Sequence, residues 1–144
     1  MNLESLIKRH EGNGLPGKPF EAYRCPSGFW TIGYGHNIEA NGLRITEAQA
    51  DELLREDLQR ATNAAIRIVG SFRMLNPPRQ AVIISMIYQM GAEGFSKFVK
   101  TIVAIESEDF NLASERMLKS VWASQTPTRA KELAHMMREG KWIE

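Results

Sequence analysis

Glu11 is the residue of this chain whose type and position best suit acid–base chemistry. It follows a short segment with helical spacing and precedes a stretch rich in glycine, proline and aromatic residues, residues 13–41. Hydrolysis of a glycosidic bond needs a group that protonates the leaving oxygen, and a glutamic acid in a half-buried cleft can stay protonated for that task. A carboxylate at a helix C-terminus opposes the helix dipole, which suggests a partner or a function. A solvated carboxylate at a helix end is the alternative interpretation.

Cys25 is the only cysteine, so its chemistry is that of a single thiol. One cysteine forms no disulfide within the chain and no zinc site built on a cysteine pair. The three histidines are scattered along the sequence, which makes a zinc site unexpected. We therefore expect neither a metal nor another cofactor.

The elements that must position Glu11 and Cys25 can be predicted from the sequence pattern. Apolar residues at helical spacing, followed by a glycine, predict a helix over residues 3–11. Turn-forming residues separate Phe20–Arg24 from Phe29–Tyr34, which predicts a small β-hairpin or a three-stranded sheet.

The rest of the chain has helical patterns with recognisable start signals. Thr46 and Gln49 have the spacing of a capping box and predict the start of a helix over residues 46–69. Asn76 predicts the cap of a helix that contains Ala81–Met90, a nearly all-apolar stretch expected to be buried. Further helices are expected at residues 96–106, 109–121 and 127–139, the last with Thr126 as its cap and Gly140 as its terminator.

These elements predict an α+β fold with two lobes in a single domain, residues 1–144. A small sheet-containing lobe, about residues 12–45, is expected to be joined by a long helix, about residues 46–69, to a larger helical lobe. That lobe is expected to contain about residues 70–144 and the helix over residues 3–11. The chain length is ordinary for one domain.

The composition excludes several classes of protein. Hydrophobic residues make up 43% and charged residues 24%, as in soluble globular proteins. The net charge of +1 does not indicate a nucleic-acid partner. No apolar run approaches the roughly 20 residues that span a bilayer, and Met1–His10 lacks the apolar stretch of a signal peptide.

Six segments together resemble phage-type lysozymes, glycoside hydrolase family 24. In that family a Glu is followed by an Asp or Cys and then by a Thr that begins the motif T-I-G-x-G-H. The resemblance implies a lysozyme-like fold and hydrolysis of the β-1,4 bonds between N-acetylmuramic acid and N-acetylglucosamine in bacterial peptidoglycan. The active-site segments are Arg9–Gly12, Tyr23–Cys25 and Thr31–His36, and those of the helical lobe are Tyr88–Gly91, Lys119–Ala130 and Gly140–Trp142.

The same resemblance implies roles for individual residues. Glu11 would be the general acid, Cys25 stands where most members have a second carboxylate, and Thr31 would hold water or substrate. Arg129 would contact Glu11 across the cleft. The residues expected to bind saccharide are Gly35, Tyr88, Gln89, Thr101 and Trp122.

Plainer structural interpretations remain for several of these residues. His36, which the resemblance pairs with Asp57, is expected to form a structural ion pair rather than to act as a catalyst. Tyr88 and Trp122 also suit a hydrophobic core. Gly33 and Gly35 also suit close packing of a strand.

The chain departs from the family pattern at two places. A lengthened loop over Asn13–Pro19 separates Glu11 from Cys25, and we expect it to lie on the surface. A thiol replaces the carboxylate at Cys25: a thiolate would act as base or nucleophile, whereas a thiol would only position a water. We favour the water-positioning role, because few molecules would carry a protonated Glu11 and an ionised Cys25 together. Glu21, four residues before Cys25, is another carboxylate, but we expect it to point outward rather than to substitute.

The sequence thus predicts a monomeric peptidoglycan hydrolase of the endolysin type. Without a signal peptide, it is expected to wait in the host cytoplasm until a separate pore releases it to the cell wall. A lytic transglycosylase, which needs only one Glu, is the nearest alternative. A non-catalytic glycan-binding or virion protein is the alternative from another class.

Overall fold

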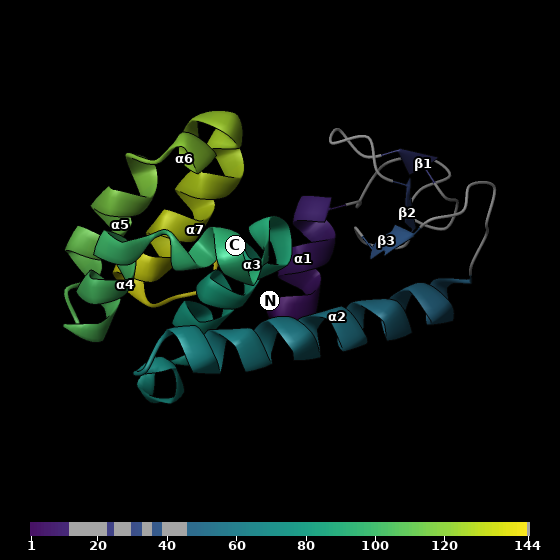
Figure 1. Cartoon of the computed structure of the whole chain (residues 1–144), viewed down its shortest axis with the longest axis horizontal. Helices are drawn as coiled ribbons and strands as arrows, with labels where there is room; N and C mark the ends of the chain where they lie inside the picture. The colour runs from purple at the N-terminus through teal and green to yellow at the C-terminus, as the bar shows by residue number, and fades with distance from the viewer. Residues whose placement is uncertain (12–22, 25–29, 33–35, 39–45, 144) are drawn as a thin grey trace. The chain divides into compact units, whose positions relative to one another are not determined.

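The computed structural model describes residues 1–11, 23–24, 30–32, 36–38 and 46–143 (Figure 1). The chain divides into two compact units. The N-terminal unit is Glu4–Arg60, and the C-terminal unit is Met1–Leu3 with Ala61–Glu144. The boundary between them falls within a single long helix, α2 (Glu47–Ile68). Among the residues described, no helix is long and apolar enough to cross a membrane.

The N-terminal unit contains helix α1 (Leu3–Glu11) except for its first residue, a small antiparallel sheet and the first part of α2. The sheet has the order β1-β2-β3, with Thr31 opposite Tyr23 on one side and Asn37 on the other. Its strands are β1 (Tyr23–Arg24), β2 (Trp30–Ile32) and β3 (His36–Ile38).

The start of α2 follows the predicted capping box. The backbone N–H of Thr46 donates to Gln49 Oε1 at 2.8 Å, and the backbone N–H of Gln49 donates to Thr46 Oγ1 at 3.1 Å. Two N–H groups that have no partner within the helix are thereby satisfied. An ion pair between Lys8 and Asp51, 2.6 Å long, joins α1 to this end of α2.

The expected α+β class is wrong, because helices dominate the structure. In the ranges 1–11 and 46–143, helices account for 82% of the residues and no strand occurs. The strands within residues 23–38 are two or three residues long, shorter than the five or six that are typical. Turn residues and aromatics between 13 and 41 predicted a sheet, but strands this short do not form a layer that defines the fold. The fold is helical.

The C-terminal unit is a cluster of helices around α3 and α7 (Figure 1, teal to yellow). Helix α7 packs against α3 and α5, and α4 packs against α5. The stretch Ala81–Ile87 of α3 is buried, which confirms the central buried helix expected from the sequence. The elements of this unit after α2 are η1 (Phe72–Met74), α3 (Pro77–Ser96), α4 (Val99–Glu106), α5 (Phe110–Leu118), α6 (Val121–Gln125) and α7 (Pro127–Glu139).

Helix α3 begins at the predicted cap and contains a kink that was not predicted. Asn76 accepts a hydrogen bond from the backbone N–H of Arg79 at 3.1 Å. At Gly91 the backbone has φ 82° and ψ 162°, a conformation that only glycine adopts readily. The residues before the kink include Tyr88 and Gln89, so glycine fixes where this part of the helix ends.

The helix expected over residues 109–121 is interrupted. It ends at Leu118, and Ser120 caps the short helix α6 by accepting a hydrogen bond from the backbone N–H of Ala123. Thr126 precedes α7 but its side chain does not cap it. Its hydroxyl donates instead to the carbonyl of Trp122 at 3.0 Å. A serine or threonine can bond backward as well as forward, and here the backward bond forms.

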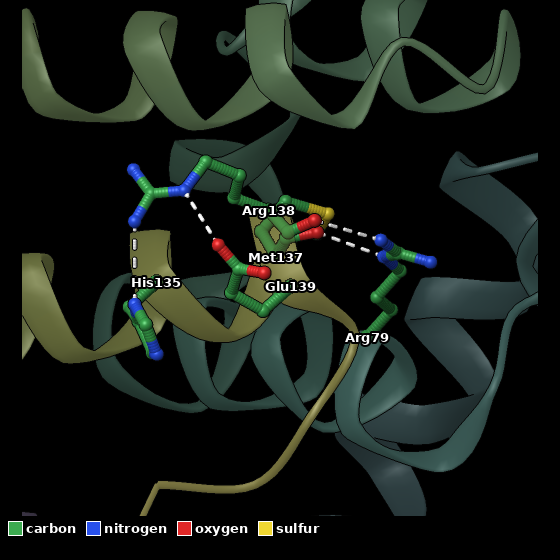
Figure 2. Close-up of polar contacts among 5 residues, drawn as sticks. All are labelled: Arg79, His135, Met137, Arg138 and Glu139. Carbon is green, nitrogen blue, oxygen red and sulfur yellow. Dashed lines mark hydrogen bonds and ion pairs between the residues drawn. The ribbon is translucent and has the colours of Figure 1, made fainter.

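The C-terminus of α7 is held by two residues at the start of α3, and Figure 2 shows one of them, Arg79. Arg79 donates from Nε to the carbonyl of Met137 at 2.8 Å and from Nη2 to that of Arg138 at 2.9 Å. Asn76 Nδ2 donates to the carbonyl of Gly140 at 2.9 Å. Partial burial lowers the pKa of the Arg79 guanidinium from its usual value, and the nearby charge of Glu139 offsets only part of this effect. An arginine nevertheless remains protonated. A cation at these carbonyls stabilises the helix end.

Gly140 terminates α7 as predicted, with φ 66° and ψ 32°. We expect Gly140→Ala to lower the free energy of unfolding by about 2–4 kcal/mol. The reasons are that alanine is strained in the left-handed conformation and that its Cβ would weaken the hydrogen bonds of Arg79 and Asn76 to α7. The added Cβ would lie 2.9 Å from Arg79 Cζ and 3.0 Å from Asn76 Nδ2. Urea denaturation measures the change. Gly140→Asn should be milder, because asparagine tolerates this conformation. An alanine variant as stable as wild type would contradict this account.

Candidate active site

Glu11 lies where the sequence placed it, as the last residue of α1. Its side chain is half-buried, and Lys8, Arg9 and His10 precede it in the same helix turn. Basic residues suit a helix C-terminus, whereas a carboxylate does not. Local helix energetics therefore explain the three basic residues but not Glu11.

The other two residues predicted to be catalytic fall in or near the sheet. Thr31 is the middle residue of β2, the central strand. Cys25 lies outside the described residues, between β1 and β2. The predicted saccharide-binding residue Gly35 also lies outside them.

The proposed pair of His36 and Asp57 is described only in part. His36 begins β3, opposite Ile32, and nothing further is described of it. Asp57 is in α2 and forms an ion pair with Arg60, one turn later. The pairing of His36 with Asp57 stays a prediction.

Two of the predicted saccharide-binding residues contact each other. Trp122 Nε1 donates to Gln89 Oε1 at 2.7 Å, joining α6 to the end of α3 before its kink. Phe98 contacts Trp122 edge to face, with ring centroids 6.1 Å apart. The indole is therefore fixed by one hydrogen bond and one aromatic contact.

Burial separates the predicted saccharide-binding residues of the C-terminal unit into two groups. Thr101 is 3% exposed and Trp122 is 7% exposed, as core residues are. Tyr88 and Gln89 are half-buried and keep some accessible surface. A role for Trp122 or Thr101 against a sugar stays a prediction.

Arg129, in the first turn of α7, is a buried cation with a defined partner. It is 9% exposed, and its Nη2 donates to Ser85 Oγ on α3 at 3.2 Å. Glu11 belongs to the N-terminal unit and Arg129 to the C-terminal unit. Their pairing stays a prediction from the resemblance.

Sequence reasoning missed Ser85 and Phe98. Ser85 is the one polar residue in the apolar run Ala81–Ile87, and that isolation was a usable signal. Phe98 carried no signal, because its contact with Trp122 depends on how α4 and α6 pack.

One pocket in the C-terminal unit lies away from these contacts. It has a volume of about 200 Å³, and none of the predicted site residues lines it. The pocket is lined by Ser71, Met74, Leu75, Asn76, Arg79, Ile105, Glu108 and Phe110.

In the described part of the chain, no cluster of three or more His, Cys, Asp or Glu side chains could hold a metal ion.

Comparison with known proteins shows the family of this chain. Residues 13–138 match the phage lysozyme family. The chain therefore belongs to the phage lysozyme family. A lysozyme is a glycoside hydrolase of bacterial peptidoglycan, and that is the class of activity of this chain.

Individual relatives resemble most of the chain. It is 33% identical to an endolysin of Acyrthosiphon pisum secondary endosymbiont phage 1, over 79% of this chain and 73% of the relative. It is 25% identical to a probable T4-type lysozyme 2 of Dictyostelium discoideum, over 96% and 95% respectively. It is 27% identical to the peptidoglycan hydrolase gp36 of Pseudomonas phage phiKMV, over 81% of this chain but 13% of that protein.

Proposed function

We propose that this protein is a muramidase that cleaves the β-1,4 bond from N-acetylmuramic acid to N-acetylglucosamine. The observation that carries the proposal is the family match over residues 13–138, together with Glu11 at the end of α1. The endolysin among its relatives supports a role in lysis of the host cell.

Glu11 supplies the proton in the proposed reaction. The carboxyl proton passes to the glycosidic oxygen as the bond from that oxygen to the sugar carbon breaks. A water provides the oxygen that ends on that carbon, and its proton restores the carboxyl group. Cys25 and Thr31 are proposed to position this water.

The proposed binding surface for the glycan includes residues at the end of α3. Tyr88 and Gln89 keep accessible surface there, and the hydrogen bond from Trp122 fixes the Gln89 amide oxygen. The amide nitrogen of Gln89 is proposed to donate a hydrogen bond to a sugar. Gly35 is proposed to leave room for the sugar, and Thr101 to support this surface from α4.

Loss of turbidity in a suspension of purified cell walls tests the activity. Wild-type protein should clear the suspension and release soluble glycan fragments. A protein that binds the walls without clearing them would instead be a glycan-binding module. The monomeric state and the wait in the host cytoplasm stay predictions, which sedimentation and cell fractionation can test.

The role of Cys25 can be tested with two substitutions. If Cys25 positions water, Cys25→Ser should retain most of the activity and Cys25→Asp should equal or exceed wild type. If a thiolate is required, Cys25→Ser should lower the rate about 10²–10⁴-fold, which is the usual contribution of a general base to the rate. Wild-type activity should then rise as the pH passes about 8.5, where an unperturbed thiol ionises.

A pH–rate profile of the three proteins side by side separates these roles. An inactive serine variant, together with an alkaline wild-type optimum, would make Cys25 the base or nucleophile. Alkylation of the thiol should inhibit in either case, because the adduct would occupy the site.

A further inference from the structure

Ser85 and Arg129 form a buried polar pair between the two central helices of the C-terminal unit. Ser85 is fully buried on α3, and Arg129 is 9% exposed on α7. The guanidinium donates from Nη2 to Ser85 Oγ at 3.2 Å. Helices α3 and α7 pack against each other, so this hydrogen bond lies within their interface.

Packing alone does not explain a serine at this position. Ser85 is flanked by Ile84 and Met86 in a run that is otherwise apolar and buried. Alanine would fill almost the same volume, favours helix more strongly, and buries no hydroxyl group. A hydroxyl is favourable here because it accepts a hydrogen bond from the guanidinium.

The hydrogen bond constrains the orientation of Arg129 as well as its position. A guanidinium is planar and presents its donors in a fixed fork, so an acceptor at Nη2 restricts rotation of the whole plane. A charged group needs this control for precise contact with a carboxylate or a sugar oxygen. Arg129 lies in the first turn of α7, and the side chain of an arginine has several rotatable bonds that must be held for the guanidinium to keep one orientation.

We propose that Ser85 is a positioning residue for the reaction, which fixes the plane of the Arg129 guanidinium. The proposal rests on the proposed function and on the role in the site that the resemblance implies for Arg129. Ser85 does not touch the substrate and acts only through Arg129. Removal of the Ser85 hydroxyl should therefore lower the rate at which bound substrate is cleaved and leave the affinity for substrate unchanged.

The test compares three substitutions of Ser85 with a matched control. Ser85→Ala removes the acceptor, and Ser85→Cys keeps the volume but offers a weak acceptor. Ser85→Thr keeps the hydroxyl. Ser114→Ala is the control, because Ser114 is a serine of α5 that is 2% exposed and has no place in the site. Arg129→Lys shows how much kcat falls when the planar guanidinium itself is absent.

Steady-state kinetics on soluble peptidoglycan oligomers give kcat and KM separately. Ser85→Ala and Ser85→Cys should lower kcat about 3- to 10-fold, the range expected for one hydrogen bond, with KM within about twofold of wild type. Ser85→Thr and Ser114→Ala should keep kcat near wild type. The NMR signals of the Arg129 Nη protons should show faster rotation in Ser85→Ala and Ser85→Cys alone.

The possible failures can be told apart. If Arg129→Lys loses activity while Ser85→Ala and Ser85→Cys match Ser114→Ala, the positioning role is wrong and the proposed function stands. If wild type releases no glycan fragments, the proposed function fails and the positioning role fails with it. If Ser85→Ala does not fold, Ser85→Cys decides the question, and wild-type kcat in that variant would overturn the proposal.

Discussion

Replacement of Glu11 by glutamine is expected to lower the rate of peptidoglycan hydrolysis by about 10²–10⁴-fold, the usual contribution of general acid catalysis. The amide has nearly the same shape but cannot donate a proton to the glycosidic oxygen. Initial rates on purified cell walls measure the loss. Urea denaturation of the same preparation checks that the variant is folded, so that a loss of rate reports on the reaction.

Glu4→Gln is the matched control for this variant. Glu4 is in the first turn of the same helix, where a carboxylate is favourable. The control should lose a little stability and no catalytic rate. A folded Glu11→Gln protein with a rate within threefold of wild type would contradict the assignment of the acid.

Replacement of Arg129 by lysine is expected to lower kcat roughly 10- to 100-fold, since a hydrogen bond to a charged group contributes about 1.5–3 kcal/mol. Lysine keeps the charge but loses the planar fork that Ser85 orients. The loss of activity should exceed the loss of stability when both are expressed as free energies. Kinetics and urea denaturation on the same preparation give the two values.

Arg138→Lys controls for the general effect of this substitution in α7. Arg138 is exposed and its side chain contacts Glu139 and His135 (Figure 2). The hydrogen bond from Arg138 lowers the pKa of Glu139. Neither Glu139 nor His135 is among the predicted site residues, so Arg138 serves as the control. Activity of the control should equal wild type. If Arg129→Lys were equally active, Arg129 would have no part in the reaction.

The sequence predicted those parts of the fold that depend on local signals. The capping box at Thr46, the cap at Asn76 and the terminator at Gly140 were all confirmed. Each of these signals acts within about four residues. The contact between side chain and nearby backbone therefore does not depend on how the rest of the chain folds. Helix α1 and its final residue Glu11 were predicted for the same reason.

Features that depend on contacts between distant segments were not predicted. Arg79 holds the carbonyls of Met137 and Arg138, nearly 60 residues away, and no local pattern indicates that contact. The break between α5 and α6 is an exception: Ser120 caps a new helix through a local hydrogen bond, and this signal in the sequence was overlooked. The α+β class failed because residue types typical of turns and strands do not determine how long the strands become.

For the candidate site, too, the sequence predicted individual residues but not the contacts between distant ones. Glu11, Gln89 and Trp122 were identified by resemblance, and the structure adds the hydrogen bond that joins Gln89 to Trp122. Ser85 was overlooked because a single serine in an apolar run has many explanations until its partner is known. The partner, Arg129, is 44 residues further along the chain.

The products of a cell-wall digest test the proposed reaction most directly. Peptidoglycan is digested with wild-type protein, reduced with borohydride, and analysed by mass spectrometry. Hydrolysis at N-acetylmuramic acid predicts reducing muramic acid ends, which borohydride converts to the alcohol, and a water incorporated at each cleaved bond. Anhydro-muramic ends, which borohydride leaves unchanged, or reducing N-acetylglucosamine ends, would contradict the account.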